Sequence, residues 1–237
     1  MAYPWIAGDH LNAADLDSAI GKASFGGDGS DGALAISSGT TTLDCANKKV
    51  FIKNYSSISI TGTTGKLAFS NPHTSGTIII LRSQGNVTLT STSVPLIDVS
   101  SMGTAGSVNG VGFSNQTTKA GGAPTAGATM TFDFPLNGLG LFYHDVLPGP
   151  AGGNGGNGGG SGGNGGAGGL GGGALLIECG GALNSTGTIW SKGANGANGG
   201  NGGSFQGGGG GGGGGCGGYI GIVYKTLTAN TGTYTVT

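Results

Sequence analysis

Apolar and polar residues alternate in short runs between Ala33 and about Tyr143, and turns rich in Gly, Ser and Asn separate these runs. This period of two predicts β-strands, and no helix-period pattern occurs there. The run Ile78–Leu81 is apolar at every position, as expected for a strand covered on both faces. The clearest expected strands are Val50–Ile52, Ile58–Thr61, Lys66–Phe69, Thr77–Leu81, Asn86–Thr90, Leu96–Val99 and Met130–Phe134.

The segment from Gly76 to Gly103 reads as strand, turn, strand, turn, strand. Such a succession is typical of one coil of a β-solenoid. A β-sandwich has similar strand spacing, so both architectures remain open for this body.

Glycine then replaces the alternating pattern with a period of three. Triplets such as GGN fill Gly152–Gly173 with one slip at Ser161, they return at Gly193, and nine glycines span Gly207–Gly215. A helix of the polyproline II type has three residues per turn and rises about 3.1 Å per residue. Its polyglycine counterpart has bare edges, so neighbouring rods can approach and share backbone hydrogen bonds. We expect packed polyglycine II rods of roughly 28–37 Å, with a flexible linker as the alternative.

Two segments that each follow a glycine block resemble one another. Ala174–Ser191 and Tyr219–Val236 share an apolar strand, a Leu-containing bridge, Thr-Gly-Thr and an aromatic strand, and they match after one inserted residue. A looser version occupies Ile78–Val99. The repeat predicts an all-β protein in which glycine rods alternate with β elements.

A short helix is expected near the N-terminus. Asn12 can cap it, with Asp15 in the capping-box position, and Leu16 and Ile20 share one face. A helix of this length is not stable alone. We therefore expect a homo-oligomer, most simply a homotrimer, joined partly through Trp5, Leu16 and Ile20.

The amino-acid composition excludes several classes of function. The chain has 59 glycines among 237 residues, only 8% charged residues and a formal net charge of −1. Nucleic-acid binding needs clustered Lys and Arg, which are absent, and no apolar run is long enough to span a membrane. The N-terminus also lacks the pattern of a secretory signal. A charge-poor surface without an export signal predicts a virion protein that is assembled in the host cytoplasm and acts outside the cell.

Residues suited to catalysis or metal binding are scattered. The three cysteines have no zinc or redox spacing, and the histidines have no partner at a ligand or triad spacing. The stretch Asp28–Gly32 fits a turn better than a calcium loop, because no Glu occupies the last loop position. The acids of the later body do not form an evident glycosidase pair. We expect no enzyme activity, no cofactor and no metal. The acids are Asp98, Asp133, Asp145 and Glu178.

Two resemblances to known families follow from these motifs. The string Trp5–Ile20, WIAGDHLNAADLDSAI, resembles the start of many phage tail-fibre proteins, in which this segment lies at the virion-attached end. The glycine triplets of Pro150–Cys216 resemble the stacked polyglycine II helices of the distal tail-fibre adhesins of T-even-like phages, which present loops to the host receptor. In this chain two β elements alternate with the glycine blocks, which fits a whole short fibre or spike.

These resemblances imply a fibre or spike that attaches the virion to a host surface glycan or outer-membrane protein. The alternative is a purely structural decoration or filament subunit. The expected units are residues 1–32 for attachment and oligomerisation, 33–147 for the β-rich body and 148–237 for the glycine-rich domain. Exposed aromatic and amide side chains suit receptor contact, although the two flanking aromatics can instead pack on the strands. The candidate receptor-binding residues are Phe205, Gln206, Asn195, Asn198, Asn201, Trp190 and Tyr219.

Overall fold

The computed structural model describes residues 25–104, 148–159, 162–203 and 206–237. Every regular element in these ranges is a β-strand, and none of the described residues is helical. The all-β class is therefore confirmed. The expected N-terminal helix, the oligomerisation residues and one expected strand lie outside the described residues: Trp5, Leu16, Ile20 and Met130–Phe134.

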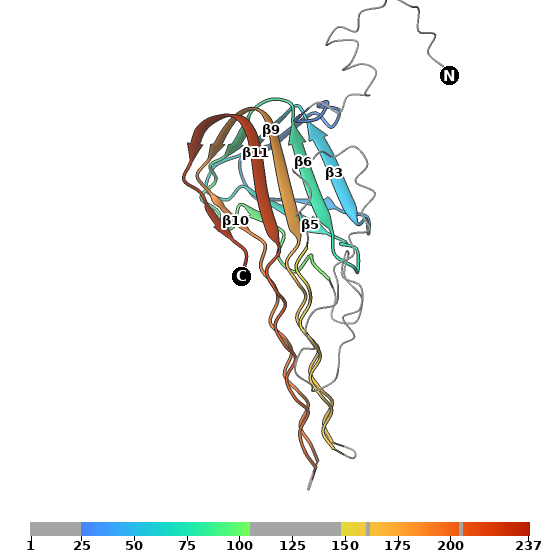
Figure 1. Cartoon of the computed structure of the whole chain (residues 1–237). Helices are drawn as coiled ribbons and strands as arrows, with labels where there is room; N and C mark the ends of the chain where they lie inside the picture. The colour runs from blue at the N-terminus through green and yellow to red at the C-terminus, as the bar shows by residue number, and fades with distance from the viewer. Residues whose placement is uncertain (1–24, 105–147, 160–161, 204–205) are drawn as a thin grey trace, which may run out of the picture.

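The strands form two parallel sheets (Figure 1). The seven-stranded sheet contains β1 (Ala33–Ile36), β4 (Ser57–Ile60), β7 (Val87–Leu89), β9 (Ala174–Ser185), β6 (Ile78–Ser83), β3 (Val50–Tyr55) and β11 (Tyr219–Asn230). The five-stranded sheet contains β12 (Thr233–Thr235), β10 (Thr188–Trp190), β8 (Ile97–Asp98), β5 (Lys66–Ser70) and β2 (Thr40–Asp44). The six expected strands within the described residues are confirmed, with shifts at their ends. β1 and β2 were not among the clearest expected strands.

Strands that lie far apart in the sequence pair in chain order. β3, β6, β9 and β11 lie side by side, and so do β2, β5, β8, β10 and β12. β9 pairs with β6, so the sheets continue across the expected boundary between residues 147 and 148.

The repeat in the sequence corresponds to direct pairing. Tyr219 pairs with Ala174, and Asn230 pairs with Ser185, at the same sequence separation. Two local register shifts in between cancel one another. The one inserted residue that the sequence predicts corresponds to the first of these shifts, the second shift compensates for it, and the repeat itself is confirmed. The looser copy is also confirmed, since Ile78 pairs with Ala174.

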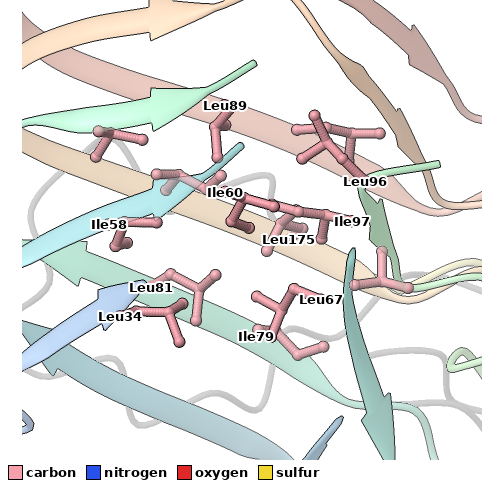
Figure 2. Packing of buried hydrophobic residues seen from close by; sticks show 14 of the residues in the cluster. Leu34, Ile58, Ile60, Leu67, Ile79, Leu81, Leu89, Leu96, Ile97 and Leu175 are labelled. Atoms are coloured by element: carbon pink, nitrogen blue, oxygen red, sulfur yellow. The ribbon is translucent and has the colours of Figure 1, made fainter. Parts of the chain in front are cut away.

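Alternate side chains of the strands fill one apolar core between the sheets (Figure 2). Ile79 and Leu81 point into this core, whereas Ile78 and Ile80 lie in a second cluster with Leu176 on the other face of the same sheet. The fully apolar run is thus buried on both faces, as the sequence predicts. Burying each of these large side chains contributes about 1.5–3 kcal/mol.

The glycine segments form four rods that run together away from the sheets (Figure 1). We call residues 149–158 rod 1, 163–172 rod 2, 193–202 rod 3 and 207–216 rod 4, and the four together the stalk. Rods 1 and 2 lie between β8 and β9 in the chain, and rods 3 and 4 join β10 to β11.

Backbone hydrogen bonds connect the rods at every third residue. The N–H groups of Gly152 and Gly155 donate to Gly169 and Gly166 of rod 2, with N···O distances of 2.9 and 2.8 Å. The same three-residue step recurs between rods 2 and 4, rods 2 and 3, rods 3 and 4, and rods 1 and 4. The expectation that the glycine segments pack side by side is therefore confirmed.

Glycine is required at many of the positions where two rods are in contact. A Cβ added at Gly166 would lie 2.0 Å from the carbonyl oxygen of Ala197, and one at Gly168 would lie 1.9 Å from that of Gly152. Rod 2 carries side chains only on its third edge, which faces solvent, at Asn164, Ala167 and Leu170. The three-residue period therefore records which edge of the rod is free.

A turn leads into the first strand, as expected for Asp28–Gly32. The N–H of Ser30 donates to Oδ1 of Asp28 at 3.1 Å. Asp31 accepts hydrogen bonds from Lys53 Nζ at 2.8 Å and from the Asn54 N–H at 2.7 Å. Burial acts to raise the pKa of Asp31, but these hydrogen bonds and the Lys53 charge outweigh it, so the pKa is lowered below 3.8.

We expect Asp31→Asn to reduce the free energy of unfolding at neutral pH by about 0.5–1 kcal/mol, since the ion pair is partly exposed. Because the pKa of Asp31 is lower in the folded than in the unfolded protein, its contribution is complete above an unfolded pKa of about 3.9. It is lost as the pH falls through the folded pKa. Urea unfolding from pH 7 to pH 2.5 should show the two proteins converging at acid pH. A constant difference over this range would contradict the assignment.

Candidate binding surface on the glycine stalk

Three asparagines form an exposed row along rod 3. Asn195, Asn198 and Asn201 follow one another at three-residue steps, and all three are exposed. In a helix with three residues per turn this spacing places them on one edge, about 9 Å apart. Each amide offers two donors and one acceptor oxygen. The structure thus brings together three of the candidate receptor-binding residues as a regular, uncharged hydrogen-bonding surface.

Gln206 lies beyond the end of this row, where rod 3 leads to rod 4. It is exposed, and its N–H donates to the carbonyl oxygen of Gly203 at 3.0 Å, which closes a tight turn. This turn is at the end of the stalk that is farthest from the sheets (Figure 1). Phe205, its expected partner in recognition, lies outside the described residues.

Asparagines on rod 1 have a different role. Oδ1 of Asn154 accepts a hydrogen bond from the N–H of Gly168, and Oδ1 of Asn157 accepts one from Gly165, both at 2.8 Å. These side chains connect rods 1 and 2. Asn occupies the same triplet position in rod 1 and in rod 3. Only the contacts therefore distinguish the asparagines of rod 1 from the row on rod 3.

Trp190 lies on β10, at the base of the stalk and apart from the asparagine row. The Lys192 Nζ lies 3.4 Å from the centre of its ring, a cation–π contact. Residues two apart in an extended segment point to the same side, so this spacing was the available signal for Lys192. Trp190 also pairs in register with Asp98, whose Oδ2 lies 3.3 Å from Lys66 Nζ. The outer face of this sheet therefore presents an indole among two lysines and a carboxylate.

Tyr219 opens β11 and is partly buried. It packs against the cluster of Ile78, Ile80 and Leu176. Trp190 and Tyr219 thus lie on different sheets, and neither joins the row on rod 3.

The thiols among the described residues are all free. Burial, assisted by the charge of Asp44, raises the pKa of Cys45 to about 11, and burial also raises the pKa of Cys179. Cys179 is completely buried, as expected for a small apolar residue, whereas Cys216 is exposed. At neutral pH both buried sulfurs remain thiols, the less nucleophilic form.

The described ranges contain no group of three or more His, Cys, Asp or Glu side chains placed to hold a metal ion. They also contain no helix long and apolar enough to cross a membrane.

Searches for related proteins returned nothing: no protein-family model, no curated protein and no solved structure matches this chain.

Proposed function

We propose that this protein is a phage virion fibre or spike protein that attaches the particle to the host cell surface. The observation that supports this most is the stalk, which projects from the sheets (Figure 1) and carries an exposed, uncharged amide row. The exposed Gln206 follows this row, where rod 3 leads to rod 4. Recognition through amides and a neighbouring aromatic ring suits a surface glycan or the loops of an outer-membrane protein. The function involves no enzyme activity and no cofactor.

In this proposal the stalk consists of polyglycine II helices. The three-residue step of the bonds between rods supports it, because polyproline II geometry also repeats every three residues. None of the described glycines from 149 to 218 has a φ in the left-handed region, which favours the negative-φ form.

The β body is, in this proposal, a β-solenoid. Parallel pairing in chain order supports this, because each pass of the chain lies beside the next. An immunoglobulin-like sandwich is built from antiparallel sheets.

The remaining parts of the proposal concern assembly. The protein is a homotrimer of the virion, and its segment Trp5–Ile20 binds other virion proteins. Trp5, Leu16 and Ile20 join the copies at that end.

Binding to intact bacteria tests the attachment function. We expect the fluorescently labelled protein to bind cells of at least one strain in a panel of bacterial strains, and the double variant Phe205→Gly/Gln206→Gly to lose this binding. The reason is that the side chains at the end of the stalk determine which receptor is bound, whereas the rods only make the stalk rigid. Asn164→Gly, an exposed amide on another rod edge, is the matched control and should bind as the wild type does. Undiminished binding by the double variant would show that Phe205 and Gln206 are not the receptor-binding site. If the wild type binds to no strain, a purely structural subunit is favoured.

A further inference from the structure

One third of the backbone N–H groups of rod 4 point in a direction in which they meet no acceptor among the described residues. In a rod with three residues per turn, successive N–H groups point in three directions about 120° apart. The N–H groups of Gly209 and its equivalents donate to rod 3, and those of Gly210 and its equivalents donate to rod 1. The third set forms no hydrogen bond among the described residues: Gly208, Gly211 and Gly214.

The same edge is glycine although the chain itself does not require it. A Cβ at Gly209 would lie 2.0 Å from the carbonyl oxygen of Asn164, so glycine is needed there. At Gly208, Gly211 and Gly214 the nearest atoms would be 3.4, 3.8 and 3.7 Å away, which is ordinary contact. All three residues are exposed. The solvent-facing edges of rods 2 and 3, in contrast, carry Asn, Ala and Leu side chains.

The strand that follows rod 4 is open as well. Rod 4 continues directly into β11, which pairs only with β9 among the described strands. Its side chains Tyr224 and Leu227 are 40% and 46% exposed. An unpaired strand edge with exposed apolar side chains invites another chain. Two separate observations, one on rod 4 and one on β11, therefore identify open backbone edges on two consecutive segments of the chain.

We propose that this side is where copies of the chain meet, with rod 4 of three copies packed in parallel around a common threefold axis. A bare glycine edge fits closely only against another bare backbone, and rod 4 has no side chain from Gly207 to Gly215. Rods 2 and 4 already pack in parallel, with Gly166 N–H donating to Gly210 at 2.8 Å, so the required contact exists within the chain.

The threefold arrangement closes the hydrogen bonding. Each copy donates its third set of N–H groups to free carbonyl oxygens on rod 4 of the next copy, and the cycle ends after three. No charged residue lies between Gly193 and Tyr219, so identical edges meet without repulsion. This inference is independent of the attachment function, because a structural subunit would use the same contact.

Alanine substitutions test it with little disturbance of the single chain. In the triple variant Gly208→Ala/Gly211→Ala/Gly214→Ala each added methyl has room within its own chain, but it faces the backbone of the next copy. The double variant Gly153→Ala/Gly159→Ala is the matched control, because an added Cβ meets nothing within 4 Å at either position. Light scattering over a dilution series should give the mass of three chains for the wild type and the control. The triple variant should dissociate at a higher protein concentration with an unchanged circular dichroism spectrum, because it keeps only the contacts proposed for Trp5, Leu16 and Ile20.

Amide hydrogen exchange in the same samples isolates this edge from other contacts between copies. The amides of Gly208, Gly211 and Gly214 should be protected from exchange in the wild type. In the single variant Gly211→Ala, the amides of residues 208, 211 and 214 should exchange at the rate of free amides. This single variant replaces the triple variant if the triple variant does not fold. A wild type of any other mass, free exchange at these amides in the wild type, or loss of the trimer in the control would overturn the proposal.

Discussion

Replacing Gly196 by valine will separate rods 3 and 4. A Cβ at this position would lie 2.2 Å from the carbonyl oxygen of Gly212, and both atoms belong to rods that are fixed on two sides. The three hydrogen bonds between these rods then break, each with a net contribution of about 1 kcal/mol. The amides of Gly209, Gly212 and Gly215 should therefore exchange about a hundredfold faster.

The matched control is Asn198→Ser, on the exposed edge of the same rod, which should change the local stability by no more than about 0.5 kcal/mol. The thermal unfolding of the β body should be the same in both variants, because its apolar core contains no residue of the stalk. Unchanged exchange at Gly209, Gly212 and Gly215 in Gly196→Val would contradict the packing of the rods.

Removing the Glu178 carboxylate should strongly destabilise the β body. Its Oε2 lies 3.1 Å from Arg82 Nε, and the Glu178 side chain is only 3% exposed. The Arg82 Nε is not aligned for a hydrogen bond, so this contact is an ion pair. The same oxygen accepts the N–H of Gly26 at 3.2 Å. Glu178→Ala leaves the largely buried Arg82 charge unpaired, and we expect a loss of about 3 kcal/mol in the free energy of unfolding.

The double variant Arg82→Met/Glu178→Met separates this effect from lost packing. Because it removes both charges and keeps apolar volume, it should be much more stable than Glu178→Ala. Urea unfolding of the three proteins measures the difference. If the free energy of unfolding of Glu178→Ala lies within about 1 kcal/mol of the wild-type value, the Arg82–Glu178 ion pair contributes little to stability.

Much of this structure follows from periodicity. Alternation located the strands from Val50 to Asp98, because one side of each strand must face the core. The triplets located the rods, because an edge that packs closely on a neighbouring rod has no room for a Cβ. The repeat also identified which segments lie side by side, although the pairing of β9 with β11 adds a second register shift that compensates for the expected insertion.

Which neighbour each edge of a glycine rod contacts became clear only from the tertiary structure. The nine residues Gly207–Gly215 are identical in sequence, yet in space they form three sets that face rod 3, rod 1 and solvent. Asn157 and Asn198 likewise occupy the same triplet position and are both exposed, but among the described residues only Asn157 of the two accepts a hydrogen bond from a neighbouring rod. The three-residue period favoured rods over a flexible linker and gave the spacing of their side chains. Which edge stays open depends on how four rods pack around one another, and identical residues carry no local signal for that choice.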